Sequence, residues 1–243
     1  MVLALDSSTL TLSLALVERA GGPAALVEAE TFGPPLKQSE LLPGAIERLL
    51  ARHQVALPQL EGIVVGLGPG SFTGLRIGLA TAKALAYAAR LRVAGASSLA
   101  AVALDGPAGV LRPAAVARQG ELYVGRYRRG PNGLESLGPE QAMTPAELAS
   151  ELRGEPEAVA LGPAVAPYRD ALLAAGAAPQ QLSLAGAVPR AAALAELARL
   201  PAGYDAQALF ALEPHYVRAS EAERNPRFPP LAGPPPEARI RRD

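Results

Sequence analysis

The sequence predicts an α/β protein of two related lobes, each built from a mixed sheet flanked by helices. Within the first 32 residues, apolar and polar residues alternate as they do in β-strands. From residue 39 the apolar residues recur at helical spacing. A weaker version of the same succession, strands first and helices after, follows residue 100. The length of 243 residues allows one large domain or two small ones.

The first lobe, about residues 1–100, is expected to open with three antiparallel strands at 2–5, 12–16 and 25–32. The middle strand alternates with a period of two, which predicts one buried face. Short turns separate the strands, so neighbouring strands are expected to pair. A helix is predicted over 39–53, with Ser39 as its N-cap and with Leu42 and Ile46 on its apolar stripe.

A buried strand is predicted at 63–65, parallel to the first strand because a helical crossover precedes it. A glycine-rich turn, a long helix over 71–90 and a short strand from Val93 follow. The first lobe therefore reads strand, strand, strand, helix, strand, helix (βββαβα).

The second lobe, about residues 101–200, is expected to contain a strand pair at 114–117 and 121–127. A helix begins at Thr144, which forms a capping box with Glu147. A strand at 158–161 and helices at 165–174 and 191–200 follow. The segment 201–224, with a short helix at 205–212, is expected to pack back on the first lobe. Residues 225–243 contain six prolines, which predicts a disordered tail.

The composition excludes several kinds of site. The chain has no cysteine, which removes disulfides, thiolate zinc sites and thiol nucleophiles. Its two histidines, His53 and His215, are far apart in the sequence and predict no metal site. Acidic and basic residues balance at 23 each, so no global field attracts nucleic acid. Without a spanning apolar stretch or a signal peptide, the chain is expected to be cytoplasmic, with no membrane contact.

The glycine-rich turn contains Gly68, Pro69 and Gly70, followed by Ser71 and Thr73. One interpretation is purely structural: the turn reverses the chain, and Ser71 or Thr73 caps the helix. The other is that free N–H groups at the helix start hold an anion. The turn lacks the Gly-Lys-Ser/Thr ending of a Walker loop and the spacing of a Rossmann turn. Both interpretations stay open at this point.

Small residues recur along the long helix. Gly74, Gly78 and Ala82 are four residues apart, with Leu75 and Leu79 beside them. Each glycine inside a helix costs about 1 kcal/mol of helix propensity. The ridge therefore predicts a close packing contact, made either within the chain or with a second chain.

Several motifs together resemble one family. The run GPGSFTGLRIG at 68–78, followed by AKALA at 82–86, closely resembles the signature of the TsaB (YeaZ) family. Further similar segments are LALDSST at 3–9, SELLP at 39–43, RQGELY at 118–123 and EPHYVR at 213–218. One position departs: Val116 stands where the family commonly has Asp.

The resemblance implies a two-lobed actin-like ATPase architecture with RNase-H-like lobes. Asp6 occupies the position of an aspartate that faces nucleotide phosphates in catalytic relatives, which makes it the candidate cofactor-binding residue. The resemblance also implies a non-catalytic paralogue of TsaD, without a cofactor of its own, that activates TsaD. With the ATPase TsaE, the complex transfers a threonylcarbamoyl group to the adenosine beside the anticodon in ANN-decoding tRNAs.

The implied contact with TsaD uses the helices at 39–53 and 71–90, and a homodimer through the same surface is expected when TsaD is absent. The residues expected at this interface are Leu42, Ile46, Gly74, Leu75, Gly78, Leu79 and Ala82.

Three other functions are alternatives to this interpretation. An ATP-binding or ATP-hydrolysing enzyme of the same superfold would need a second phosphate loop, and the second lobe offers only the turn at 104–107. A metallopeptidase is disfavoured because metal ligands are missing. An RNA-binding module could use a small basic and aromatic patch or the arginine-rich end at 239–242. The patch consists of Tyr123, Arg126, Tyr127, Arg128 and Arg129.

Overall fold

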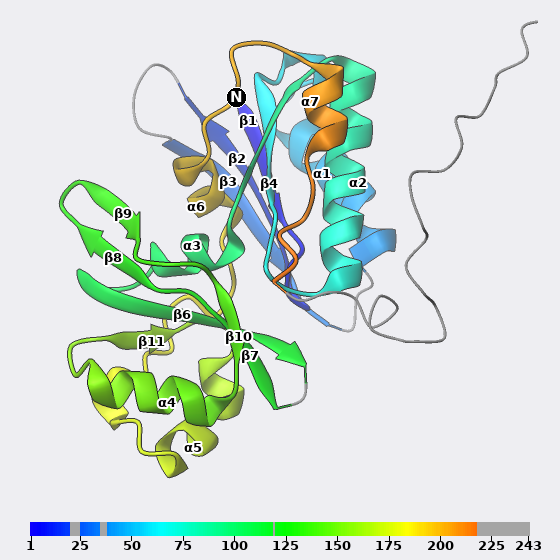
Figure 1. The fold of residues 1–243 in the computed structure, drawn as a ribbon. Helices are drawn as coiled ribbons and strands as arrows, with labels where there is room; N and C mark the ends of the chain where they lie inside the picture. The colour runs from blue at the N-terminus through cyan, green and yellow to red at the C-terminus, as the bar shows by residue number, and fades with distance from the viewer. Residues whose placement is uncertain (20–24, 35–37, 119, 218–243) are drawn as a thin grey trace, which may run out of the picture.

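The computed structural model describes residues 1–19, 25–34, 38–118 and 120–217. Two lobes, each centred on one sheet, lie one above the other in Figure 1. The predicted tail at 225–243 falls outside the described residues. The observed architecture is the predicted two-lobed α/β fold.

The first sheet has the strand order β3-β2-β1-β4-β5. Strand β1 pairs antiparallel with β2 and parallel with β4, as expected from the hairpin and the helical crossover. The strands are β1 (Val2–Asp6), β2 (Leu12–Glu18), β3 (Ala25–Phe32), β4 (Gly62–Gly66) and β5 (Arg92–Ala96).

Helices cover both faces of this sheet. Helices α1 (Gln38–Arg52) and α2 (Phe72–Ala89) pack on the face that contains Leu3 and Leu5. Helix α6 (Ala191–Leu197) packs on the opposite face, which contains Val2 and Ala4. The prediction that β2 has one buried face was therefore wrong: α6 buries its second face as well.

The second sheet has the order β10-β7-β6-β8-β9, and β11 pairs with β6. Helices α4 and α5 cover one face, and α3 packs on the other. The elements are α3 (Ser98–Ala103), β6 (Gly109–Arg118), β7 (Glu121–Val124), β8 (Tyr127–Gly130), β9 (Gly133–Ser136), β10 (Gln141–Met143), α4 (Pro145–Gly154), β11 (Val159–Leu161) and α5 (Val165–Ala174). Two 3₁₀ turns, Leu57–Gln59 and Pro179–Gln181, and the short helix α7 (Ala206–Ala211) complete the described structure.

The second lobe departs from the prediction in two ways. The strand expected over 121–127 is two strands, because the chain turns at Gly125 and Arg126. Helix α3, the hairpin of β8 and β9, and β10 were not anticipated, since each is short and carries little periodicity. The helix expected over 191–200 ends at Leu197, and it packs on the first sheet rather than on the second.

Candidate functional site

The glycine-rich turn connects β4 to α2. Gly68 has a φ of +94°, in the left-handed region that favours glycine, and the Gly68–Pro69 peptide is cis. Ser71 is the N-cap of α2: its side chain accepts a hydrogen bond from the Gly74 N–H at 3.2 Å. Thr73 lies in the first turn of α2 with its side chain exposed and does not cap the helix.

Backbone donors of this turn are already bonded within the protein. The Leu67 N–H donates to the carbonyl of Ala96 at 2.9 Å, and the Gly68 N–H donates to the Ser98 hydroxyl at 3.2 Å. The Ser71 N–H donates to the carbonyl of Ser8 at 2.7 Å. These contacts favour the structural interpretation of the turn over an anion cradle.

Asp6 ends β1, as expected, and its side chain is fully buried. Its Oδ1 accepts from the Ser8 hydroxyl and its Oδ2 from the Ser98 hydroxyl, both at 2.6 Å. Burial raises the pKa of the Asp6 carboxyl, and the hydrogen bonds from Ser8 and Ser98 oppose that rise. A Cβ on Gly66 would lie 2.0 Å from Oδ2. Protein groups therefore enclose this carboxylate, and a nucleotide would reach it only after the Ser8 turn moved.

The small-residue ridge makes its close contact inside the chain. A Cβ on Gly74 would lie 2.1 Å from the Ser7 carbonyl oxygen, and one on Gly78 would lie 2.1 Å from the Ser7 Oγ. The Ser7 hydroxyl donates to the carbonyl of Gly74 at 2.8 Å. The end of β1, rather than a second chain, occupies the space that these glycines leave open.

The residues expected at the partner interface share this burial. None of these seven residues is exposed: each is less than 9% accessible and belongs to the interior of the first lobe. The stripe that helical periodicity detects is the core-facing side of each helix, so the residues available to a partner lie on the other side.

An apolar groove of about 380 Å³ lies between the outer sides of α1 and α2. Only Ile46 and Leu50 of its lining are buried; the others are exposed or half-buried. Sequence periodicity could not reveal this groove, because its residues come from two helices and the loop that follows α1. The lining residues are Pro43, Ile46, Glu47, Leu50, Ala51, Val55, Leu57, Thr81 and Leu85.

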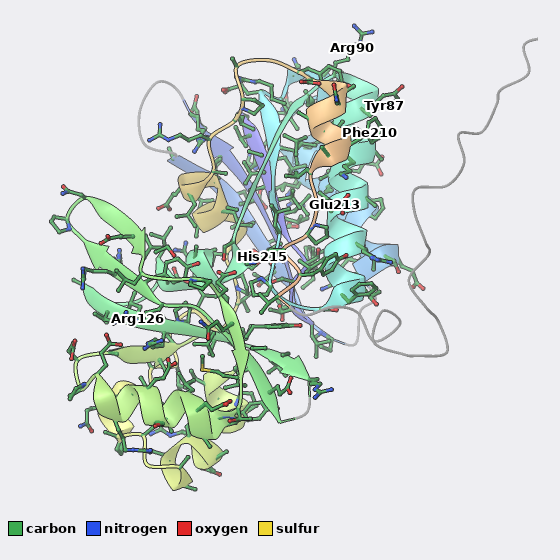
Figure 2. The ribbon with its side chains drawn as sticks, viewed as in Figure 1. Tyr87, Arg90, Arg126, Phe210, Glu213 and His215 are labelled. Carbon is green, nitrogen blue, oxygen red and sulfur yellow. The ribbon has the colours of Figure 1, made fainter. Side chains whose placement is uncertain are left out.

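Exposed aromatic side chains lie at both ends of α2. Tyr87 and Phe210 of α7 are more than half exposed, and their ring centroids are 5.5 Å apart. Figure 2 shows this pair at the far end of α2 from the second lobe. At the near end, Phe72 and Tyr216 have centroids 5.3 Å apart, and the Arg76 guanidinium lies 3.9 Å from the centroid of Phe72.

Both histidines have acidic partners that are distant in sequence. His53 Nε2 lies 2.5 Å from a carboxylate oxygen of Glu28, whose pKa is lowered by Arg52 and by His53. The Nδ1 of His215 lies 2.9 Å from Oε2 of Glu140. Sequence spacing could not reveal either pair.

The side chains of the possible RNA-binding patch do not lie together in the structure. Tyr127 is buried, Arg128 pairs with Glu135 at 3.7 Å, and Arg129 donates to the carbonyl of Gly106. Arg126 points into a different cluster, described next. These side chains do not form one basic surface.

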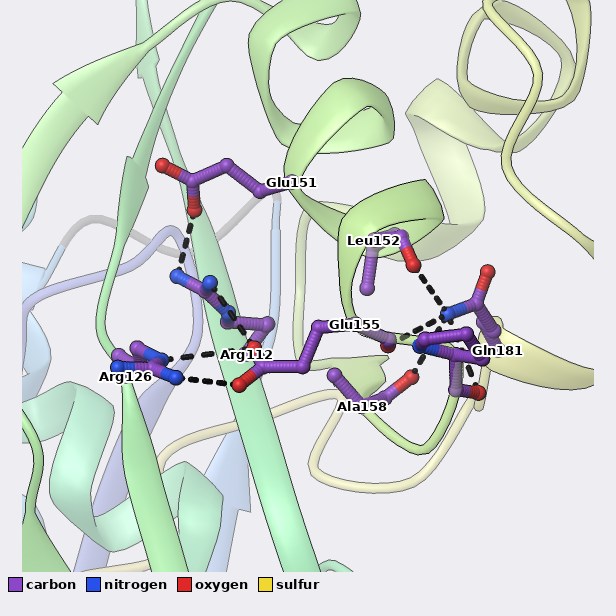
Figure 3. Close-up of polar contacts among 8 residues, drawn as sticks. Arg112, Arg126, Glu151, Leu152, Glu155, Ala158 and Gln181 are labelled. Atoms are coloured by element: carbon purple, nitrogen blue, oxygen red, sulfur yellow. Dashed lines mark hydrogen bonds and ion pairs between the residues drawn. The ribbon is translucent and has the colours of Figure 1, made fainter.

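A polar cluster in the second lobe ties β6 to α4 (Figure 3). Arg112 of β6 is buried and pairs with Glu151 at 2.5 Å and with Glu155 at 3.1 Å. Arg126 also pairs with Glu155, and this hydrogen bond, together with Arg112, lowers the pKa of the Glu155 carboxyl. The buried Gln181 amide donates at 2.8 Å to the Leu152 carbonyl, near the end of α4. This cluster organises the lobe around α4.

Neither a metal-binding cluster nor a membrane-spanning helix is present in the described ranges. No group of three or more histidine or acidic side chains there is arranged to hold a metal ion. No helix in the same ranges has the length and hydropathy needed to cross a membrane.

Residues 37–225 match the family model for TsaD, described as tRNA N6-adenosine threonylcarbamoyltransferase. The chain is 34% identical over 142 residues to the tRNA threonylcarbamoyladenosine biosynthesis protein TsaB of Bacillus subtilis. That match covers 58% of this chain and 60% of the relative. The Escherichia coli protein of the same name is 33% identical over 138 residues, which cover 55% of this chain and 57% of the relative.

A solved structure from Pseudomonas aeruginosa, named YeaZ, has a similar fold. Its TM-score is 0.67 at 28% identity, and the match covers 81% of this chain and 89% of that one. A second P. aeruginosa structure, described as uncharacterized with similarity to peptidase YeaZ, has a TM-score of 0.70 at 28% identity and covers 89% of this chain and 99% of that one. Because the family model spans more than half of the chain and these relatives carry the names TsaB and YeaZ, the chain belongs to the TsaB/YeaZ family.

Proposed function

We propose that this chain is a non-catalytic subunit in tRNA threonylcarbamoyladenosine biosynthesis, and that it acts by binding the catalytic paralogue TsaD. Membership of the TsaB/YeaZ family supports the pathway, since the curated relatives are named for it. The partner role rests on one observation above all, the apolar groove between α1 and α2.

The groove has the properties of a helix-binding surface. Its walls come from two helices, and it carries apolar side chains that are only partly buried, such as Val55 and Leu85. Amphipathic helices bind in grooves of this kind. A paralogue with an equivalent helix pair would present a similar surface, so a four-helix contact with TsaD would cover both. A homodimer through the same groove is expected when TsaD is absent.

The seven buried residues support this surface from beneath. Leu42 and Leu79 pack in the core between these helices and the sheet, and Gly74 and Gly78 let α2 approach the end of β1. Ile46 alone of the seven also lines the groove. The interface proposed here is therefore the groove and its rim.

A binding role also agrees with the enclosure of Asp6 and with the internally bonded donors of the glycine-rich turn. In this proposal the chain needs no cofactor of its own. It works in the cytoplasm with TsaD and TsaE, and it meets tRNA through the complex.

The proposal is tested by reconstituting the tRNA modification with TsaD, TsaE and the enzyme that makes the threonylcarbamoyl adenylate. Modified tRNA, counted by mass spectrometry, should form only when this chain is added, and the chain alone should hydrolyse neither ATP nor the adenylate. ATP hydrolysis by the chain alone would favour the rival ATPase function. Product formation without the chain would overturn the activator role.

A matched pair of variants tests the groove. Ala51→Arg places a long charged side chain in the groove, and Ala171→Arg places the same side chain on exposed α5 of the second lobe. Both variants should fold. Ala51→Arg should fail to co-purify with TsaD and should lose the stimulation of modification, whereas Ala171→Arg should retain both. Equal TsaD binding by the two variants would rule out the groove as the interface.

A further inference from the structure

Glu140 joins three separate parts of the chain. It lies between β9 and β10, and its side chain is only 5% exposed. Its Oε1 accepts from the Tyr127 hydroxyl at 2.6 Å and from the Ser97 hydroxyl. Its Oε2 lies 2.9 Å from His215 Nδ1. Tyr127 belongs to the second sheet, Ser97 follows β5 of the first sheet, and His215 belongs to the C-terminal segment.

The contact of Oε2 with His215 is an ion pair when the imidazole is protonated, because the two atoms do not meet in hydrogen-bond geometry. Among the described residues, no hydrogen-bond donor with good geometry reaches this buried oxygen. A buried carboxylate oxygen that loses its partner pays a desolvation penalty. The position of His215 therefore affects how favourably Glu140, and with it the loop before β10, lies against the first lobe.

The segment that carries His215, residues 206–217, is here called the C-terminal strap. Its helix α7 lies along α2, where Phe210 packs against Tyr87 and the Lys83 ammonium donates to the Phe210 carbonyl at 2.9 Å. Figure 2 shows the strap running from Phe210 down to His215, which lies near the junction of the two lobes.

The lower end of the strap is also bound to the first lobe. The His215 N–H donates to the carbonyl of Leu67 at 2.8 Å. The Tyr216 ring packs on Phe72, and its hydroxyl accepts from Arg76 Nε at 3.1 Å. Side chains on the outer side of α2 thus hold the strap in place, and the strap in turn holds Glu140 of the second lobe.

We infer that the C-terminal strap couples the outer face of α2 to the arrangement of the two lobes. A partner that displaces the aromatic contacts at Tyr87 or Phe72 shifts the strap, withdraws His215 from Glu140 and loosens the second lobe. This inference deepens the proposed function, on which it rests for the identity of that partner, TsaD.

The experiment measures the distance between the lobes in the full chain. Because the chain has no cysteine, Thr31→Cys and Asp170→Cys introduce two unique sites for spin labels. Both positions are exposed, Thr31 on β3 of the first lobe and Asp170 on α5 of the second. Double electron–electron resonance spectroscopy then gives the distribution of distances between the two lobes. Circular dichroism verifies that each variant is folded.

Three further substitutions are made in this labelled chain. His215→Leu removes the partner of Glu140, Tyr87→Ala removes the aromatic contact at the other end of the strap, and Glu213→Gln is the control. Glu213 lies in the same strap with its side chain exposed. His215→Leu and Tyr87→Ala should each broaden or shift the distance distribution, and Glu213→Gln should leave it unchanged. If His215→Leu or Tyr87→Ala leaves the distribution of a folded chain unchanged, the coupling is wrong.

A second part adds TsaD to the labelled chain. Binding should change the interlobe distribution of the parent and should cause no further change in His215→Leu. TsaD that binds without altering the parent's distribution would overturn the coupling but leave the proposed function intact. TsaD that does not bind would overturn the proposed function, and the variants measured on the chain alone would still decide whether the strap acts on the lobes.

Discussion

Gly78 of α2 and Ser7 at the end of β1 fit together only because position 78 has no side chain: a Cβ there would lie 2.1 Å from the Ser7 Oγ. The same Cβ would lie 3.2 Å from a methyl carbon of Leu5. The contact fixes α2 on the first sheet and explains why glycine, a poor helix former, stands in the middle of this helix.

Gly78→Ala should therefore lower the free energy of unfolding by about 2 kcal/mol or more, because the helix must move away from β1 to admit a methyl group. Urea denaturation measures this loss. Gly44→Ala in α1 is the matched control: its Cβ would approach only the mobile end of Arg48, at 3.2 Å. That change should stabilise the chain by up to about 1 kcal/mol, as expected for alanine in a helix.

Equal effects of the two substitutions would contradict the packing argument. The contact between Gly78 and Ser7 also decides which substitution can identify a partner surface. A large residue at position 78, such as Gly78→Leu, would lose TsaD by disturbing the fold, so loss of binding would not identify a surface. Ala51 in the groove is the informative position.

The sequence predicted the first lobe well because its elements are long and strongly periodic. Strands β1 to β4, helix α2 and the parallel pairing of β1 with β4 follow from alternation, glycine punctuation and one crossover. The short hairpin at 127–136 and α3 carry too few residues to show a period. The pattern also could not tell whether a small-residue ridge faces its own chain or another, since both require the same close approach.

The site was harder to predict than the fold. The groove and the His215–Glu140 contact join residues that are far apart in sequence, and no local spacing encodes them. The enclosure of Asp6 depends on Ser98, which lies 92 residues further along the chain. Only the folded structure shows that protein groups surround this aspartate.

The raised pKa of Asp6 predicts a pH-dependent stability. The folded protein holds the proton of the Asp6 carboxyl more tightly than the unfolded chain, whose aspartate titrates near 3.8. Protonation of Asp6 therefore adds to the free energy of unfolding, and this stabilisation is complete below pH 3.8. It is lost as the pH rises through the folded pKa. Asp6→Asn stays neutral and keeps the shape of the side chain. The stability of Asp6→Asn relative to the parent should therefore increase as the pH rises from about 4 through the raised pKa of the folded protein.

Urea denaturation of both proteins at several pH values measures this difference. Glu18→Gln, at an exposed position of β2, is the control and should show no comparable trend. A stability difference between Asp6→Asn and the parent that is constant with pH would show that the buried carboxyl does not titrate differently in the folded state.

Among the residues of the second-lobe polar cluster, Glu155 is expected to lower the free energy of unfolding most when it is substituted. Glu155→Gln removes the charge that pairs with Arg126 and with Arg112, whose side chain is only 10% exposed. The free energy of unfolding should fall by about 2 kcal/mol, which is less than the roughly 3–5 kcal/mol lost when a fully buried ion pair is broken. The loss is smaller because Arg112 still pairs with Glu151 and because Arg126 is partly exposed. Arg128→Gln breaks a pair that is exposed on both sides and should change stability by less than about 0.5 kcal/mol. Comparable losses for the two variants, in urea denaturation, would refute this ranking.

The start of α4 offers a test in which one predicted cap was right and another was wrong. The Thr144 hydroxyl accepts from the Glu147 N–H at 3.2 Å, and the Glu147 carboxylate accepts from the Thr144 N–H at 2.6 Å, as the capping box predicted. These contacts with Thr144 also lower the pKa of the Glu147 carboxyl. Thr144→Ala should therefore cost about 1 kcal/mol. Ser39 was expected to cap α1, but that helix begins at Gln38, which places Ser39 inside it with its side chain exposed. Ser39→Ala should not lower the stability, since alanine is the better helix former. Thermal denaturation measures both variants. A lower melting temperature for Ser39→Ala than for Thr144→Ala would contradict both cap assignments.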